Sequence, residues 1–372
     1  MNNRIVFMGT PDFAAGCLKV LVEAGMNVVA VVTMPDKPKG RGQKMLPSPV
    51  KEYAISAKIP VLQPVSLKDE HFLQTLYAYR ADLQIVVAFR MLPRAVWAMP
   101  PQGTFNLHAS LLPRYRGAAP IQRAVWNGET VTGVTTFMLD DNMDTGGILY
   151  QQQVPITPAD TAGTLHNKLL AVGAPLVVKT AQDLFSGTVT PKSQTEFGMQ
   201  QSATMPAPPP TAGNNTDMPA TQQIPTAPKI HKDDCRLDPT HTAQELHLQV
   251  RALSPYPAAF TTLINKDTGE KVILKVFESE VTDTTAITTI AKAIPTLSMV
   301  PKADIPTNNF QQGTLIVTDG NTLLLACADN TFLSLKDVQL QGKQKIKIEP
   351  FLRGFRPEQF LNVSLFHTVT TT

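Results

Sequence analysis

The chain has 372 residues, of which 43% are hydrophobic and 17% are charged. This length predicts two domains of ordinary size, each with its own core. Lys and Arg (33) nearly balance Asp and Glu (30), which gives a formal net charge of +3. So weak a charge excludes binding to a polyanion through the overall field of the protein, and any such contact must come from local basic clusters.

The three cysteines, Cys17, Cys235 and Cys327, lie far apart in the sequence and are odd in number. They form neither a disulfide framework nor a CxxC redox or zinc pair, which suits a reducing compartment. The apolar run before Gly9 is too short for a signal peptide, and no uncharged apolar stretch is long enough to span a membrane. We therefore expect a cytoplasmic protein that does not bind a membrane. We also expect it to act as a monomer.

Short β-branched runs alternate with helical patterns in the first half of the chain. Apolar residues between Asp12 and Gly25 recur at helical spacing. The buried strands are predicted at Arg4–Met8, Asn27–Thr33, Gln84–Phe89, Thr104–His108 and Gly133–Leu139. Such alternation predicts an α/β fold with a mostly parallel, doubly wound sheet, whose sites lie beyond the carboxyl ends of the strands. Leucine-rich helices on either side of Pro175 are expected to close this domain near Gly187.

The composition then changes abruptly. Residues Gln200–Pro228 contain seven prolines, one charged residue (Asp217) and no aromatic residue. Little apolar surface is available there to offset the entropy of an ordered chain, so the sequence predicts a disordered or extended linker. A second Thr- and Pro-rich insertion is expected at Val281–Gln312.

The last part of the chain has a different pattern. A helix is predicted to end at Ser254-Pro255, and short strands separated by Asp/Asn turns follow it. These strands are predicted at Lys271–Phe277, Thr314–Thr318, Thr322–Cys327 and Phe332–Leu335. The pattern indicates a small β-barrel.

Three polar residues form the strongest candidate for a catalytic site. Asn106 and His108 are two apart on a predicted strand, so their side chains share one face. Both could donate hydrogen bonds to one oxygen, and Asp144 could accept a proton. A bare N-x-H is weak evidence, since it also describes a hydrogen-bonded core Asn beside a structural His. Asp144 could likewise be only an Asx cap in a Gly-rich turn.

The surrounding residues favour the catalytic interpretation. Phe105–Pro120 (FNLHASLLPRYRGAAP) and Leu139–Gly147 (LDDNMDTGG) together resemble the active-site signature of the folate-dependent formyltransferases. The resemblance implies that Asn106 and His108 stabilise the oxyanion of formyl transfer. It also implies that Asp144 orients His108 and relays a proton through water.

The same resemblance implies 10-formyltetrahydrofolate as the formyl donor and no metal. The Asp cluster lacks an adjoining His pair that would complete a metal-ligand set. The expected folate-binding residues are Ser110, Leu111, Leu112, Pro113, Phe89, Met91 and Asp140. The run Phe89–Pro93 departs from the family's usual A-Y-G-x-x-L-P, and Asp238-Pro239 stands where the family often has Asp-Trp.

The opening Gly9–Phe13 (GTPDF) is not a dinucleotide-binding loop. Pro11 and Asp12 stand where glycines would be needed, and Asp12 would repel a phosphate. Nicotinamide dinucleotide binding is therefore not expected, whereas the MGTPDFA opening resembles that of the same family.

Two basic segments bear on the choice of substrate. The first, Thr33–Lys51, is predicted to be an exposed loop that follows phosphates, unless it is merely a soluble loop. Family members that formylate an aminoacyl-tRNA carry a similar loop at the acceptor end of the tRNA, with an Arg at the position of Arg41. The second segment alternates Lys345 and Lys347 with Ile346 and Ile348. This pattern predicts a strand with its charges outward and both isoleucines in the barrel, either as a tRNA track or as an ordinary edge strand. The expected tRNA-binding residues are Lys37, Lys39, Arg41, Lys44, Lys343, Lys345 and Lys347.

The resemblance covers nearly the whole chain except the two insertions. It implies a catalytic domain at 1–190, a linker at 191–228 and an OB-like tRNA-binding domain at 229–372. The implied reaction moves the formyl group to the α-amine of methionine esterified to initiator tRNA. The alternatives are a formyltetrahydrofolate hydrolase or sugar-amine formyltransferase on the same fold, and a non-catalytic RNA-binding protein on a relic enzyme scaffold.

Overall fold

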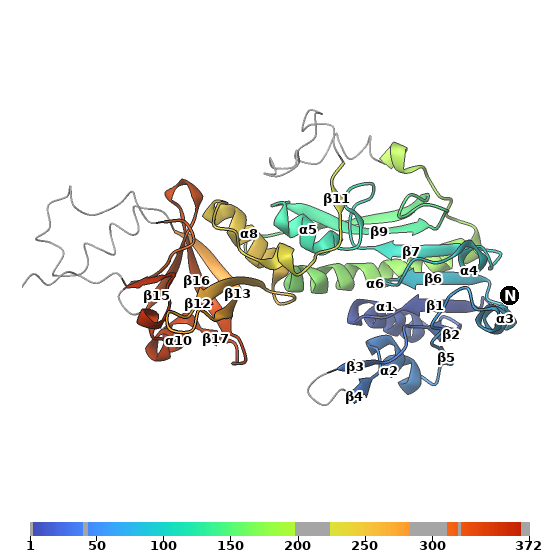
Figure 1. Cartoon of the computed structure of the whole chain (residues 1–372). Coiled ribbons are helices and arrows are strands. Elements are labelled where there is room, and N and C mark those ends of the chain that lie inside the picture. Colours follow the sequence, from blue (N-terminus) through green and yellow to red (C-terminus); the bar gives the residue numbers. More distant parts are fainter. Residues whose placement is uncertain (1–2, 40–43, 198–223, 283–310, 319–320, 366–372) are drawn as a thin grey trace, which may run out of the picture. The chain divides into compact units, whose positions relative to one another are not determined.

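The computed structural model describes residues 3–39, 44–197, 224–282, 311–318 and 321–365 (Figure 1). The chain forms two compact units. Unit 1 consists of Met1–Ala124, Glu129–Pro158 and Thr164–Lys229, and unit 2 of Val125–Gly128, Ala159–Gly163 and Ile230–Thr372. Most of both expected insertions lies outside the described residues, and the domain boundaries drawn from the sequence stay a prediction.

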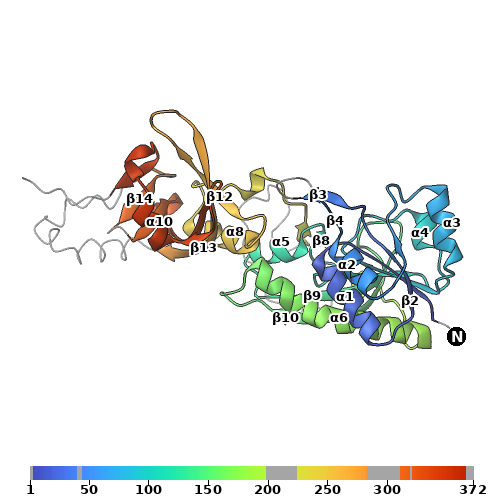
Figure 2. The same ribbon diagram turned by 90° about the horizontal axis from the view of Figure 1, so that it is seen from below.

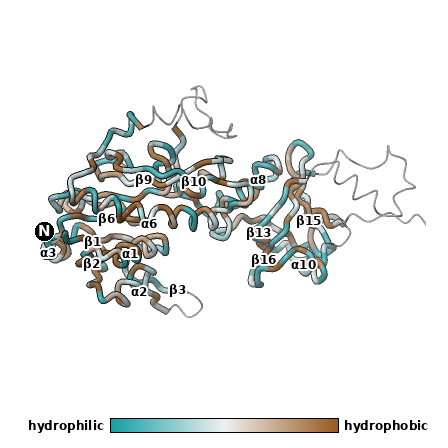
Figure 3. Tube along the Cα trace, turned by 180° about the vertical axis from the view of Figure 1, so that it is seen from behind, coloured by the Kyte–Doolittle hydropathy of each residue, from teal (hydrophilic) through white to brown (hydrophobic). Residues whose placement is uncertain are grey.

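Unit 1 is built on a seven-stranded sheet in the order β10-β9-β7-β6-β1-β2-β5. The strands are β1 (Ile5–Gly9), β2 (Val28–Val32), β5 (Val61–Leu62), β6 (Leu83–Val87), β7 (Thr104–His108), β9 (Val131–Met138) and β10 (Ile148–Pro155). Neighbours pair in parallel except at β9 and β10, which are antiparallel. The predicted mostly parallel, doubly wound sheet is confirmed. Strands β1 and β2 of this sheet are among the most hydrophobic segments of the chain (Figure 3).

Helices cover both faces of this sheet. They are α1 (Asp12–Glu23), α2 (Pro49–Ser56), α3 (Glu70–Ala78), α4 (Arg94–Trp97), α5 (Pro120–Trp126) and α6 (Ala162–Ser186). Helices α3 and α4 lie side by side and share a buried cluster with Val6, Met8 and Val86 of the sheet (Figure 2). Helix α6 packs on the other face, where Gly173 meets Leu107 of β7 and Val134 of β9.

Helix α6 differs from the expectation of separate helices around Pro175. It is a single helix with Pro175 inside it. A proline costs one backbone hydrogen bond and tends to kink or end a helix. Here buried side chains before and after it, among them Leu169 and Val177, hold both halves against unit 1. Among the described residues, α6 is the one helix long and apolar enough to cross a membrane, yet 44% of its most apolar window is buried, as in a core helix.

Two short pairings outside the main sheet correct the sequence-based picture. The basic segment 33–51, expected as a loop, contains the hairpin β3 (Lys37–Lys39) and β4 (Lys44–Leu46) and runs into α2. The end of the expected linker is also ordered, because β11 (Thr226–Ala227) pairs in parallel with β8 (Arg116–Gly117). Backbone pairing with β8 supplies the order that the apolar content of this segment could not.

Unit 2 is a curled, mainly antiparallel half-barrel in the order β12-β13-β16-β15-β14-β18, with β17 paired to β16. Its strands are β12 (Ala259–Ile264), β13 (Lys271–Thr282), β14 (Leu315–Thr318), β15 (Thr322–Ala326), β16 (Phe332–Leu340), β17 (Ile346–Lys347) and β18 (Val363–Leu365). The predicted small OB-like β-domain is confirmed. Helix α10 (Ile348–Gly354) packs against β15 and β16.

The predicted helix before Ser254-Pro255 is α8 (Ala243–Leu253). A capping box begins it, since Thr242 and Glu245 each bind the other's backbone N–H. Its apolar face, including Leu246 and Val250, belongs to the core of the half-barrel.

Candidate active site

Strand β7 carries Asn106 and His108 on the face of the sheet opposite α6. Leu107, the residue between them, contacts α6, and alternation along the strand turns its two neighbours to the other face. Asn106 lies in register with Val86 and Phe137 on the adjacent strands. It is partly exposed, and its side-chain amide forms no hydrogen bond with the part of the chain that the structure describes. A donor at the carboxyl end of a parallel strand is thus left for a ligand.

His108 is buried, with 6% of its surface exposed, and its ring orientation is fixed. Its Nε2 lies 2.8 Å from the Tyr115 carbonyl oxygen. Because a carbonyl can only accept, Nε2 carries the proton of this hydrogen bond. The edge of the ring packs against Phe137, with ring centroids 6.5 Å apart. Nδ1 is the remaining nitrogen, and it lies 4.0 Å from Oδ2 of Asp144, beyond direct hydrogen-bond distance.

Asp144 lies on the loop between β9 and β10 in the left-handed region, with φ of 55°. Asp tolerates this conformation better than most residues. Its Oδ2 accepts a hydrogen bond of 3.0 Å from the backbone N–H of Gly117. Two residues on, a Cβ at Gly146 would lie 1.7 Å from the Met138 carbonyl oxygen, so only glycine lets the loop pass β9 so closely. The structure therefore places Asp144 beside His108, and strand alternation puts Asn106 on the same face of β7 as His108.

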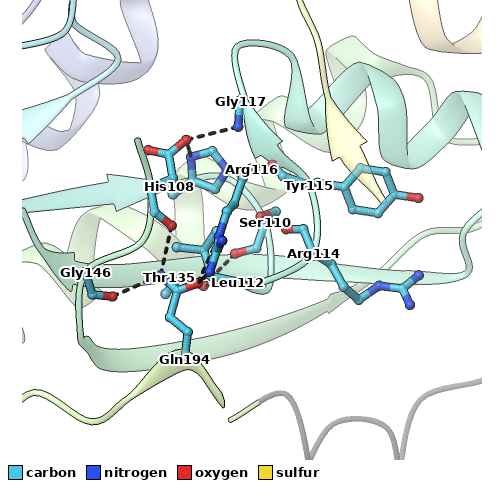
Figure 4. A network of polar contacts seen from close by, with 11 residues as sticks. His108, Ser110, Leu112, Arg114, Tyr115, Arg116, Gly117, Thr135, Gly146 and Gln194 are labelled. Atoms are coloured by element: carbon cyan, nitrogen blue, oxygen red, sulfur yellow. Dashed lines mark hydrogen bonds and ion pairs between the residues drawn. The ribbon is translucent and has the colours of Figure 1, made fainter. Parts of the chain in front are cut away.

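Gln194 completes this network, although no sequence motif indicates it. Its amide nitrogen donates to the carbonyl oxygens of Asp144 and Gly146, each at 2.9 Å. Its amide oxygen accepts from Arg116, whose side chain runs toward it in Figure 4. The residue follows α6 and lies 50 positions beyond Asp144 in the chain. No motif links two such distant positions.

The loop between β7 and β8 is held by a second group of hydrogen bonds. Thr135 donates to the Ser110 carbonyl oxygen at 2.6 Å and accepts from the Leu112 N–H at 3.1 Å (Figure 4). The Tyr115 hydroxyl donates to Glu129 at 2.6 Å, and Arg114 pairs with the same carboxylate. These contacts fix the Tyr115 carbonyl that orients His108.

The expected folate-binding residues occupy different environments. Four of them, Ser110, Leu111, Leu112 and Pro113, are buried in the loop after β7. Phe89 is partly buried, whereas Met91 is 67% exposed. Asp140 accepts hydrogen bonds from Thr145 Oγ1 at 2.7 Å and the Asn142 N–H at 3.0 Å. All seven lie on the loops that follow β6, β7 and β9, and their folate contacts stay a prediction.

The loop after β6, where the sequence departs from the family's usual wording, is braced by Arg90. Its guanidinium donates to the carbonyl oxygens of Val65 at 2.8 Å and Pro64 at 2.6 Å. Burial lowers the pKa of Arg90, but these two acceptors match its charge. Arg90 therefore ties the loop after β6 to the segment after β5.

The basic residues expected to bind tRNA fall in two places. Lys37 is exposed on β3, while Lys39 and Lys44 lie on the paired strands of the hairpin. Arg41 lies outside the described residues. Lys343, Lys345 and Lys347 lie in unit 2, near the end of β16 and on β17.

Acidic neighbours offset two of the charges in unit 2. Lys345 lies 3.0 Å from Asp337. Lys347 contacts Asp337 at 2.9 Å and Glu278 at 3.0 Å. Hydrogen bonds to these two carboxylates raise the pKa of Lys347, and the bond to Asp337 has the larger effect. The predicted placement of both isoleucines in the barrel is wrong for Ile346, which is 38% exposed. Ile348 is buried, but it begins α10 and does not belong to the strand.

No group of three or more His, Cys, Asp or Glu side chains suited to a metal ion occurs among the described residues. The three cysteines are free and buried.

Comparison with known proteins identifies the protein family. Residues 3–180 match the family Formyl transferase, and residues 229–356 match Formyl transferase, C-terminal domain. The chain belongs to the formyl transferase family.

Individual members of this family are similar to the chain over nearly its whole length. The chain is 46% identical over 354 residues to the methionyl-tRNA formyltransferase of Parabacteroides distasonis and 44% identical over 353 residues to that of Bacteroides thetaiotaomicron. Each alignment covers 95% of this chain and 96% of the relative. Among solved structures, the sugar 3N-formyl transferase WlaRD has a TM-score of 0.54 at 18% identity, over 92% of this chain and 100% of that one. That likeness shows the fold alone.

Proposed function

We propose that this enzyme transfers the formyl group of 10-formyltetrahydrofolate to the α-amine of methionine esterified to initiator tRNA. The observation that supports this most is that Asn106 and His108 share one face of β7, and that the Asp144 carboxylate lies 4.0 Å from Nδ1 of His108. Relatives that are 44% and 46% identical, and that match over nearly their whole length, carry the name methionyl-tRNA formyltransferase. The donor supplies a formyl group on an anilino nitrogen, and the chain's own residues must polarise it and move one proton.

Asn106 would donate its free amide N–H to the formyl oxygen, where negative charge develops as the amine attacks the formyl carbon. Its partial exposure at the strand end leaves room for this contact. The amide has no hydrogen bond to break among the described residues, so little reorganisation is needed.

His108 would donate from Nδ1. Since Nε2 is committed to the Tyr115 carbonyl, a neutral ring offers only an acceptor at Nδ1. Donation to the formyl oxygen therefore requires the imidazolium form. The carboxylate of Asp144, 4.0 Å away, would stabilise that charge.

Asp144 would manage the proton. As the new C–N bond forms, the attacking amine becomes acidic, and its proton passes through water to the carboxylate. The bond from the formyl carbon to the anilino nitrogen then breaks, and the same proton is delivered to that departing nitrogen. The Gly117 N–H holds one carboxylate oxygen in place throughout.

One assay tests the proposal directly. The purified protein is incubated with 10-formyltetrahydrofolate and charged initiator tRNA, and formylmethionyl-tRNA is measured. Release of formate without a formylated product would instead indicate a hydrolase. Transfer to an amino sugar but not to tRNA would indicate the sugar-amine enzyme, and absence of any folate turnover would indicate a non-catalytic RNA-binding protein.

Recognition of tRNA is assigned to the β3–β4 hairpin and its connecting residues. We expect Arg41→Ala to weaken productive use of charged tRNA while folate binding stays near normal, because Arg41 would contact phosphate or base edges. Loss of one phosphate contact should also flatten the dependence of log affinity on log salt by roughly one unit. Filter binding at several salt concentrations measures this slope. Lys58→Ala, an exposed lysine on no basic cluster, is the control. An unaltered slope with normal transfer would contradict the assignment.

The Pro-rich insertion is expected to be dispensable. Replacing residues 200–223 by a short Gly/Ser linker should leave folding and formylation largely intact, because the segment lacks residues able to build a core or supply chemistry. The replacement must stop before Pro225, whose carbonyl oxygen accepts from the Tyr115 N–H at 2.6 Å. A replacement extended through Ala227 is the matched variant, and it should lose activity. Strong loss with the shorter replacement, both units remaining folded, would contradict this.

We further infer that the enzyme acts as a monomer in the cytoplasm. The three free, buried cysteines suit a reducing compartment. Light scattering of the purified protein measures its mass in solution.

A further inference from the structure

We propose that Gln194 is a positioning residue that holds Asp144 in its catalytic position. This inference rests on the proposed function. Gln194 lies beyond the end of α6, outside the two segments of sequence that carry the catalytic residues. It is a polar side chain with 6% of its surface exposed. Burying a side-chain amide costs free energy unless its polar atoms form hydrogen bonds.

The amide of Gln194 bridges both ends of the Asp144 turn. Its nitrogen donates to the carbonyl oxygens of Asp144 and Gly146 at 2.9 Å each. The first of these carbonyls belongs to Asp144 itself, whose φ of 55° lies in the left-handed region. A non-glycine residue keeps such a conformation only when its surroundings hold it. The two hydrogen bonds supply that restraint.

A second contact fixes which way the amide points. Arg116 donates from Nε at 3.1 Å and from Nη2 at 2.5 Å to the Gln194 amide oxygen. A guanidinium can only donate, so the amide nitrogen must face the two carbonyls. Arg116 also precedes Gly117, whose N–H binds the Asp144 carboxylate at 3.0 Å. Gln194 and Arg116 thus hold the Asp144 turn next to Gly117, whose N–H binds the Asp144 carboxylate.

The backbone around Gln194 is itself anchored to the sheet. Lys192 and Ile148 exchange two backbone hydrogen bonds, at 2.8 and 2.9 Å. These bonds pair the segment around Lys192 with the start of β10. The segment can therefore transmit the rigidity of the sheet to the turn through one side chain. Asp144, which must receive and return a proton, gains a fixed position without a direct hydrogen bond to His108.

The first test measures position without measuring activity. Site-resolved hydrogen exchange of the unliganded full chain follows the Gly117 N–H, which Asp144 protects. Gln194→Met keeps the volume but removes the amide, and we expect the Gly117 N–H to exchange about tenfold faster. The Ala119 N–H, which donates to the Ala227 carbonyl oxygen at 3.1 Å, should be unchanged. Unchanged exchange at Gly117 would overturn the proposal.

The second test measures catalysis. Gln194→Met should lower kcat by about tenfold or more with KM for folate and for tRNA within about twofold of wild type. Gln194→Glu keeps the acceptor for Arg116 but loses both N–H donors, so it should be equally impaired. Gln153→Met, an exposed glutamine on β10, is the control.

The outcomes separate this inference from the function on which it rests. A normal kcat in Gln194→Met or Gln194→Glu would overturn the positioning role even if the wild type formylates tRNA. A wild type without formyl transfer would refute the proposed function, and the exchange of the Gly117 amide would still decide whether Gln194 positions Asp144. A lower melting temperature with normal exchange and unchanged kcat would show a purely structural residue.

Discussion

Replacing Asp144 by Asn should leave formyl transfer close to the background at every accessible pH. The amide oxygen of Asn can still accept from the Gly117 N–H, so the turn keeps its shape. Asn cannot take a proton from the attacking amine, however. Proton transfer of this kind contributes roughly 100- to 10,000-fold to a rate, and we expect a loss of that size in kcat. Single-turnover transfer to charged initiator tRNA across a pH series is the measurement.

Asp141→Asn is the matched control. Asp141 lies on the same loop, but it is exposed and pairs with the exposed Arg94 at 3.0 Å. Exposed pairs of this kind contribute little to stability, so this variant should transfer normally. A fully active Asp144→Asn would show that another group accepts the proton.

The sequence predicted the part of the site that depends on local order. Strand β7 has the predicted bounds, Thr104–His108. Once those bounds are known, alternation alone turns Asn106 and His108 to the same face. Asp144 could be assigned only through the resemblance, because the distance between two loops depends on how the whole sheet is assembled.

The contacts that the sequence could not supply are those between distant segments. Gln194 reaches the Asp144 turn across 50 positions, and the Tyr115 carbonyl that fixes the His108 ring is a backbone group without a side-chain signal. Lys345 and Lys347 were predicted as outward charges of a strand, and the sequence did not show that Asp337 of β16 and Glu278 of β13 offset them. Strand pairing, which decides such neighbours, cannot be read from charge counts along one segment.

A related difference concerns Pro175. Local propensity predicts a helix end at a proline, yet α6 runs through it from Ala162 to Ser186. The burial of residues on both sides of it supplies more free energy than one missing hydrogen bond removes.

Removing either oxyanion donor should lower kcat by roughly 100-fold or more, as loss of comparable donors does elsewhere. Asn106→Ala removes an amide that has no partner among the described residues, so its effect should fall on transfer and leave stability nearly unchanged. His108→Ala removes a buried ring as well. It should therefore lower the melting temperature in addition to kcat. Binding of charged tRNA should change much less than kcat in both variants.

His241→Ala and Asn142→Ala serve as controls, because both residues are exposed. Kinetics with saturating folate and tRNA separate kcat from KM, and thermal unfolding identifies any fraction of His108→Ala that fails to fold. Because both donors are proposed to act on one oxygen, the double variant should lose less than the product of the two single losses. Turnover near that of wild type in both single variants would refute the assignment of the oxyanion site. Two losses that multiply fully would indicate that Asn106 and His108 act on different atoms.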